Sequence, residues 1–286
     1  MTVAFHINIT RKNAYEVASD VYKELISLGV NVIIIDNVKE GFKCDGAEFL
    51  PIDQAVSLCD ILVTVGGDGT IIHSAHVAAL YDKPILGINA GRLGFLAGIE
   101  KEELHLLHNL IDGNYTTDSR MMLSVKRYEN DEFIKEYICL NDVVVSRGAS
   151  MHMCEIDAYS GSRKIRKYFS DGLIAATPTG STAYSLSAGG PVVDPTIEGL
   201  ILTPVCPHSI ISRSMIFNAD SEIGITVRNA NISLPIFSCD GEDGIPITDS
   251  TRLCITKSDK AAKIIRIKSD SFTEILTEKI IERNVY

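Results

Sequence analysis

A carboxylate set among glycines is the feature of this sequence best suited to chemistry. Gly66-Gly67-Asp68-Gly69-Thr70 follows the apolar run at residues 61–65. Glycines let the backbone turn sharply and approach a ligand, and N–H groups in such a turn can face phosphate oxygens. Asp68 could accept a hydrogen bond, and then a proton, from a hydroxyl group. Thr70 could cap the helix that follows. The structural alternative is a tight strand–helix turn in which Asp68 acts only as a cap.

A second glycine-containing loop covers residues 89–96 and also follows an apolar run. Arg92 in this loop could contact a phosphate, although an exposed surface arginine is the commoner case. Two glycine-rich loops at strand ends predict a ligand crevice, because ligands of open parallel sheets bind beyond the carboxyl ends of the strands.

The longest unusual segment is residues 171–191, which is dense in glycines and small hydroxyl side chains. Tyr184 could stack on a base, and Thr182 and Ser187 could bond the edge of that base. The ordinary alternative is a polar turn followed by a short helix. The length and composition of the segment favour a ligand-binding loop.

Three weaker features complete the set of candidates. Asn141-Asp142 interrupts an apolar run and could bond sugar hydroxyls, but such pairs are common in turns. His152 stands alone between methionines, and residues 238–242 end another run with two carboxylates. Taken singly, each of these is expected to be structural.

The first third of the chain alternates strand-like and helix-like segments. We expect strands at residues 3–9, 32–35, 61–65 and 85–88, and helices at 12–28, 53–58 and 70–81. Continuously apolar strands joined by helices indicate an α/β domain with a mostly parallel sheet that is covered on both faces.

From about residue 120 the pattern changes to closely spaced strands. They are expected at residues 122–127, 133–140, 143–146, 154–159, 164–169, 173–176, 223–227, 234–237 and 252–256. This series predicts an all-β, sandwich-like second domain. We place the domains at residues 1–118 and 119–264. A final helix at 272–281 makes residues 265–286 a candidate addition to the first domain.

Composition excludes several classes of protein. The 286 residues carry 27 basic and 37 acidic side chains, a net charge of −10, which argues against non-specific nucleic-acid binding. The seven scattered cysteines contain no CxxC pair and indicate free thiols in a reducing compartment. With no signal-peptide pattern and no apolar run of membrane length, a cytoplasmic protein without a membrane partner is expected.

Together and in this order, the motifs resemble those of the NAD kinases. Residues 66–70 are similar to the GGDGT of that family, and residues 171–191 to its long DG…TPTGSTAYSLSAGGP stretch. Residues 203–209 and the turn at 240–242 are similar to later family motifs. GGDGT alone also occurs in diacylglycerol and sphingosine kinases, whereas the 171–191 stretch is far more specific.

The resemblance implies an active site between an α/β domain and a β-rich domain. It implies Mg²⁺-dependent transfer of the γ-phosphate of ATP to the adenosine ribose 2′-hydroxyl of NAD, with Mg²⁺ or another divalent cation carried by ATP. It also implies a homodimer or homotetramer in which a neighbouring subunit can complete the NAD site. Asp68 would contact the reacting hydroxyl. The other implied ligand contacts are Gly69, His73, Asn141, Asp142, His152, Asp171, Thr182, Ala183, Tyr184, Ser185, Leu186 and Ser187.

The sequence departs from the family pattern at three positions. Phe169 stands where many members have arginine, Ser214 where proline is usual, and Glu242 where glutamine is common. These departures bear on the pocket more than on the reaction class. The rival hypotheses are a lipid kinase, which should offer an apolar groove for acyl chains, a non-catalytic dinucleotide sensor and, more distantly, a phosphofructokinase-like sugar kinase.

Overall fold

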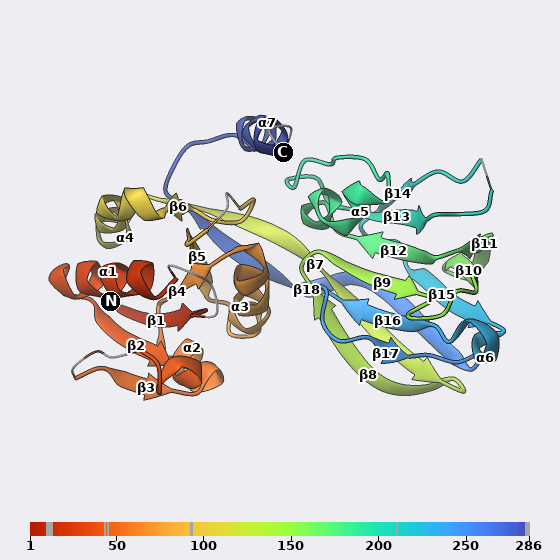
Figure 1. The fold of residues 1–286 in the computed structure, drawn as a ribbon, viewed down its shortest axis with the longest axis horizontal. Coiled ribbons are helices and arrows are strands. Elements are labelled where there is room, and N and C mark those ends of the chain that lie inside the picture. Colours follow the sequence, from red (N-terminus) through yellow and green to blue (C-terminus); the bar gives the residue numbers. More distant parts are fainter. Residues whose placement is uncertain (10–13, 43, 45, 92–93, 210, 284–286) are drawn as a thin grey trace. The chain divides into compact units, whose positions relative to one another are not determined.

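The computed structural model describes residues 1–9, 14–42, 44, 46–91, 94–209 and 211–283 (Figure 1). The chain divides into two compact units. The first comprises Met1–Ser119 together with Ala261–Tyr286, and the second comprises Arg120–Lys260. The chain leaves the first unit within β7 (Thr116–Glu129) and returns to it within β18 (Thr251–Arg266).

The first unit is built on a parallel sheet. Its strands lie in the order β18-β5-β4-β1-β2-β3, and every neighbouring pair is parallel. The strand bounds are β1 Thr2–Ile7, β2 Asn31–Ile35, β3 Glu48–Leu50, β4 Ile61–Gly66, β5 Pro84–Asn89 and β6 Ile99–Glu100, the last beside β5. The end of β18 enters this sheet, where Lys263 and Ile264 pair with Pro84 and Ile85.

Helices cover both faces of this sheet (Figure 1). Helix α1 (Ala14–Ser27) packs its apolar residues on the same face as η2 (Lys101–Leu107) and α4 (His108–Asp112). Helices α2 (Ile52–Leu58) and α3 (Asp68–Leu80) cover the opposite face. Helix α1 ends at Ser27, and Gly29 in the turn that follows has a φ of 74°, a left-handed conformation that glycine adopts readily. A short η1 (Asp36–Val38) follows β2.

The second unit is a sandwich of antiparallel sheets. One sheet has six strands in the order β14-β13-β12-β9-β16-β17. Their bounds are β9 Asp142–Ser146, β12 Gly172–Ala176, β13 Gly199–Val205, β14 Met215–Asn218, β16 Ile236–Cys239 and β17 Ile245–Pro246. The facing strands are β7, β8 (Glu132–Cys139), β10 (Cys154–Ser160), β11 (Arg163–Ser170), β15 (Ile223–Arg228) and β18.

The core of the second unit lies between these layers. Leu123, Ile156 and Ile225 from one side meet Val145 and Phe237 from the other, all fully or almost fully buried. The outer face of the six-stranded sheet is also buried, against the segment that holds η3 (Thr179–Thr182) and α5 (Tyr184–Ser187). Burial on both faces explains why β12 and β13 are continuously buried along their length.

The predicted fold class is confirmed: an α/β first unit and an all-β second unit. Several boundaries were wrong. Leu234 was expected in a strand, but it has a φ of 48° at the end of α6 (Ala230–Ser233). The final helix, α7, covers Phe272–Arg283.

Strand β13 was missed because Pro204 lies within it, and proline normally argues against a paired strand. Pro204 lies beyond the part of β13 that pairs with β14, so only one side of the strand is paired there. The described residues contain no helix long and apolar enough to cross a membrane.

Candidate active site

The carboxyl ends of β1 and β4 form the point where the strand order of the first unit reverses. Strands β2 and β3 lie on one side of β1, and the next strands in the sequence, β4 and β5, lie on its other side. Ligands of such sheets bind at this switch point. Residues 66–70 lie there, directly after β4, and Asn8 after β1 donates from its side chain to Thr70 Oγ1 at 3.0 Å.

Asp68 is the first residue of α3, and two backbone N–H groups hold its carboxylate. Phe95 N donates to Oδ2 at 2.9 Å, and Leu96 N donates to Oδ1 at 3.2 Å. The helix cap is Gly67, with no side-chain cap bond, so the alternatives in which Asp68 or Thr70 caps the helix were wrong. The two predicted glycine loops therefore meet at this carboxylate. Arg92 in the second loop falls outside the described residues.

The surroundings of Asp68 combine tight packing with an open side. A Cβ on Gly94 would overlap Asp68 Oδ1 and lie 3.1 Å from its Cγ, so only glycine lets this loop approach the carboxylate. Gly69 is exposed, and a Cβ there would meet no atom within 4 Å. His73 is exposed one turn along the helix, with its ring centroid 6.1 Å from that of His6. Burial, with a smaller effect of His73, lowers the pKa of His6 to about 4.

In the second unit, the Asn141-Asp142 turn is anchored by Asp240. One carboxylate oxygen, Oδ1, accepts from Asn141 N at 2.8 Å and from Asp142 N at 2.9 Å. The other accepts from Leu140 N at 2.6 Å, and Asp240 N donates in return to Asp142 O at 2.9 Å. A single side chain thus fixes three successive peptide units of a predicted ligand-binding turn.

The same turn is held from its other side by the start of the 177–191 segment. Thr177 donates its hydroxyl to Leu140 O at 2.6 Å and its N–H to Asn141 O at 2.8 Å. Gly180 packs against the Asn141 backbone so closely that a Cβ would lie 2.6 Å from the Asn141 carbonyl carbon. Two predicted motifs, far apart in sequence, therefore form one rigid structure.

Asp142 itself is a buried carboxyl group. Burial, with a contribution from the nearby Asp240 charge, raises the pKa of Asp142 to about 7. A buried carboxyl in a predicted binding turn is the kind of perturbed group that concentrates at functional sites.

Residues 182–187 divide into buried anchors and exposed side chains. The Thr182 hydroxyl donates to Thr179 O at 3.2 Å, and Ser185 Oγ lies 3.0 Å from Thr203 Oγ. Ala183 and Leu186 are half-buried. Tyr184, 47% exposed, and the exposed Ser187 present their side chains to the surface. Of the predicted base-contacting groups, Tyr184 and Ser187 are thus accessible, whereas Thr182 bonds its own turn.

Asp171 and His152 are connected through Arg147. Arg147 Nε lies 2.9 Å from Asp171 Oδ1, and its Nη1 donates to Ser150 O. Ser150 Oγ in turn accepts from His152 N at 3.1 Å, and the His152 side chain is exposed. Arg147 therefore positions the turn that carries His152.

Comparison with known proteins decides the family. Models described as the ATP-NAD kinase N-terminal and C-terminal domains match residues 3–115 and 140–267. The NAD kinase of Caldanaerobacter subterraneus is 38% identical over 281 residues, 96% of this chain and 97% of that protein. The chain belongs to the ATP-NAD kinase family. The NAD kinase of Natranaerobius thermophilus is 34% identical over 276 residues, covering 96% of this chain and 95% of the relative.

Solved structures agree with this family. Yeast NADH kinase, solved with NADH, matches with a TM-score of 0.85 and 26% identity over 97% of this chain and 86% of that one. An NAD kinase from Archaeoglobus fulgidus, solved with ATP, shares the fold with a TM-score of 0.76 at 24% identity over 98% of each chain. The reaction of the family is transfer of the ATP γ-phosphate to the 2′-hydroxyl of NAD, giving NADP and ADP. The predicted fold, family and reaction are confirmed.

The three positions that depart from the NAD kinase pattern are exposed or half-buried. Phe169 is 46% exposed, with Lys167 Nζ 5.5 Å from its ring centroid, so a cation lies near the position where arginine is usual. Glu242 is exposed, and its carbonyl accepts from Ser238 Oγ at 2.5 Å. Ser214 is half-buried.

Sequence reasoning missed the groups that hold the candidate site residues in place. Taken alone, Asp240 was expected to be part of an ordinary turn. Arg147 was not among the candidate residues. The only local signal for Asp240 was a carboxylate directly before a glycine. Among the described residues, no group of three or more His, Cys, Asp or Glu side chains is arranged to hold a metal ion.

Proposed function

We propose that Asp68 is the general base of this NAD kinase, orienting the 2′-hydroxyl of the adenosine ribose and accepting its proton. The observation that carries the proposal is the position of its carboxylate. It lies at the switch point of the parallel sheet, beside the open face at Gly69, with each oxygen accepting from a backbone N–H. An ionised carboxylate is an acceptor only, which is the chemistry that a base for the proton of a ribose hydroxyl needs.

We propose that the second unit binds the dinucleotide. Asn141 and Asp142 would contact the adenosine part, and the exposed Tyr184 would stack on a base. His73, His152, Asp171 and the remaining residues of 182–187 would line the nucleotide sites. The rigid support of the Asn141-Asp142 turn favours such a role, because precise binding needs groups whose geometry is fixed before the ligand arrives.

We propose that Mg²⁺ or another divalent cation enters with ATP. When bound, it would neutralise charge on the phosphates during transfer. We also propose a cytoplasmic homodimer or homotetramer in which a neighbouring subunit completes the NAD site. The seven scattered cysteines, with no CxxC pair in the sequence, favour a reducing compartment.

The decisive experiment measures NADP formation from NAD, ATP and Mg²⁺. Asp68→Asn keeps the shape of the side chain and removes the base, so turnover should fall by about 10²–10⁴-fold while NAD binding is largely kept. Asp53→Asn, which alters an exposed carboxylate in the first turn of α2 in the same unit, is the matched control and should leave turnover near normal.

Two results would overturn parts of this proposal. Near-normal turnover in Asp68→Asn would remove Asp68 from the chemistry. A wild-type protein that binds NAD but forms no NADP with any of several phosphate donors and metals would instead be a nucleotide sensor.

A further inference from the structure

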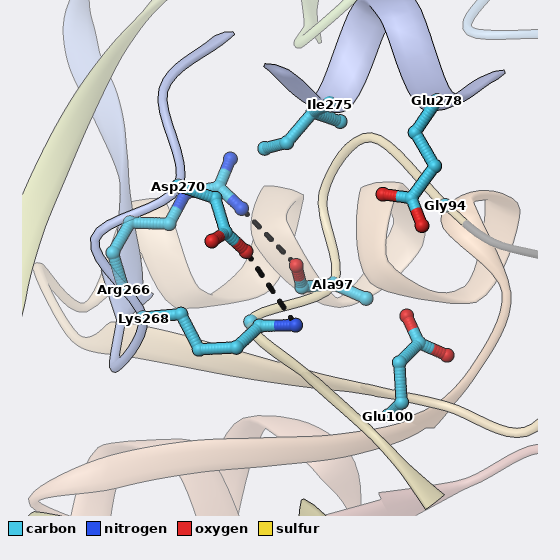
Figure 2. Close-up of a pocket in the computed structure, with 9 residues that line it drawn as sticks. Gly94, Ala97, Glu100, Arg266, Lys268, Asp270, Ile275 and Glu278 are labelled. Atoms are coloured by element: carbon cyan, nitrogen blue, oxygen red, sulfur yellow. Dashed lines mark hydrogen bonds and ion pairs between the residues drawn. The ribbon is translucent and has the colours of Figure 1, made fainter.

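A small cavity in the first unit lies beside the loop that holds Asp68. Its volume is about 40 Å³. Gly94, Ala97 and Gly98 of the loop line one side of it, and Arg266, Lys268 and Asp270 line another (Figure 2). The cavity therefore marks the place where the last strand of the chain meets the loop beside the candidate base.

Arg266, the last residue of β18, binds two carbonyl groups of this loop. Its Nη1 donates to Ala97 O at 3.1 Å, and its Nη2 donates to Phe95 O at 3.2 Å (Figure 2 draws the first). Its Nε lies 3.8 Å from Asp118 Oδ2, and the side chain is largely buried. The planar fork of a guanidinium suits two acceptors at fixed positions better than the single ammonium of lysine does.

One of these carbonyls belongs to a peptide unit that also binds Asp68. Phe95 C=O and Leu96 N–H are the two polar ends of one planar trans peptide, and they point in opposite directions. Arg266 binds the oxygen end at 3.2 Å, and Asp68 Oδ1 accepts from the nitrogen end at 3.2 Å. The orientation of this peptide thus depends on both side chains.

We infer that Arg266 is a positioning residue for the NAD kinase reaction, acting on Asp68 through the Phe95–Leu96 peptide. A cation on the carbonyl side fixes the peptide plane and polarises its N–H toward the carboxylate. Gly94 and Gly98 allow the loop to pack closely enough for this arrangement, since a Cβ on Gly98 would lie 2.7 Å from Leu86. The inference rests on the proposed role of Asp68 as the base.

Lys268 provides a matched comparison within the same cavity. It also carries a positive charge there, but it forms ion pairs with Glu103 at 3.0 Å and with Asp270 at 3.5 Å. If catalysis needed only a positive charge in the cavity, substitution of Lys268 and substitution of Arg266 would lower kcat equally. If the peptide orientation matters, only Arg266 should affect kcat.

The first test compares Arg266→Met with Lys268→Met in the NADP-forming assay. Displacement of a catalytic group by a distant change can cost about 100-fold in rate. Arg266→Met should therefore lower kcat by about 10- to 100-fold with the KM values for NAD and ATP nearly unchanged. Lys268→Met should stay within about threefold of the wild type in kcat. Equal losses in both variants would overturn the inference.

A double-mutant cycle then separates this inference from the role of Asp68. Arg266→Met is measured in the wild type and in the Asp68→Asn protein. If Arg266 acts through Asp68, its substitution should cost much less than tenfold in the Asp68→Asn background, because residues that act as a unit are not additive. The same loss in both backgrounds would show that Arg266 acts elsewhere. An Asp68→Asn protein with normal turnover would refute the base instead.

Arg266→Lys covers the case in which Arg266→Met does not fold. It keeps the charge near Asp118 but offers one point donor for two carbonyls, so an intermediate loss in kcat is expected. The same cycle is run with this variant, with thermal unfolding recorded for every protein. A wild-type kcat in Arg266→Lys would contradict the inference that one side chain must donate to both loop carbonyls.

Discussion

At the scale of single residues, the candidate site depends on carboxylates that bind backbone N–H groups. Asp68 does this in the first unit, and Asp240 does it in the second. The glycines around Asp68 made it recognisable in the sequence. The turn at Asp240 resembles a family motif, but its anchoring role was not recognisable, because its partners lie 98 to 100 residues earlier in the chain.

Asp240→Asn should loosen the Asn141-Asp142 turn. The asparagine side chain has a single acceptor oxygen for the three backbone N–H groups that Asp240 binds. Its NH₂ group is a donor and would face at least one of these N–H groups. Leaving a buried donor unpaired costs about 1–3 kcal/mol, so the melting temperature should fall and the KM for NAD should rise about tenfold. Asp243→Asn, an exposed carboxylate of the same turn, is the control. Unchanged stability and KM in Asp240→Asn would contradict the anchoring role.

Asp142 should make stability depend on pH. Its pKa of about 7 in the folded protein exceeds its ordinary value of 3.8, so the folded state holds the proton more tightly than the unfolded state does. This contribution is complete below pH 3.8 and is lost as the pH rises to about 7. At about 1.4 kcal/mol per pKa unit, the rise from 3.8 to about 7 corresponds to a loss on the order of 4 kcal/mol.

The measurement is urea unfolding of wild type and Asp142→Asn between pH 4 and 8. The stability of the variant relative to the wild type should increase with pH and level off above about pH 7. The opposite trend that His6 produces, through its pKa of about 4, is common to both proteins and cancels in the difference. Asp259→Asn, at an exposed site, should show no such trend. A constant difference would exclude the raised pKa.

At the scale of elements, the apolar runs predicted most strands because each is buried on at least one face. Strand β4 and the turn after it were placed from the sequence, since the apolar run ends where the glycines begin. Strands β13 and β14 were not, because Pro204 and the short length of β14 hide the pattern. The contact between the 177–191 segment and the Asn141-Asp142 turn has no local signature.

Gly180→Ala tests that contact. The added methyl would lie 2.6 Å from the Asn141 carbonyl carbon and 2.8 Å from its Cα, where only backbone could move. Overpacking of this kind costs about 1–3 kcal/mol, and the KM for NAD should rise as the turn is displaced. Gly224→Ala is the control, because its nearest new neighbour would be Tyr159 Cβ at an ordinary 3.4 Å. Equal effects of both substitutions would argue against a special role for the contact.

At the scale of the whole molecule, the first unit is formed by two segments from opposite ends of the chain. Local periodicity could indicate the final helix, but it could not show that Lys263 and Ile264 extend the parallel sheet beside β5. Such pairing joins residues from opposite ends of the chain. It also brings Arg266 to the loop of residues 94–98, which no sequence pattern indicated.

This discontinuity predicts different behaviour for fragments of the two units. The fragment 120–260 contains the whole sandwich core, so it should unfold cooperatively with a β-type circular dichroism spectrum. The fragment 1–119 lacks Ile264 and Ile265, both fully buried, and should be less stable or unfolded. Tethering residues 261–286 to it by a flexible linker should restore a cooperative transition. The same tethered segment carrying Ile264→Asp and Ile265→Asp should not, because it would bury two charges without partners. If fragment 1–119 alone were as stable as the tethered protein, the last strand would be dispensable for the first unit.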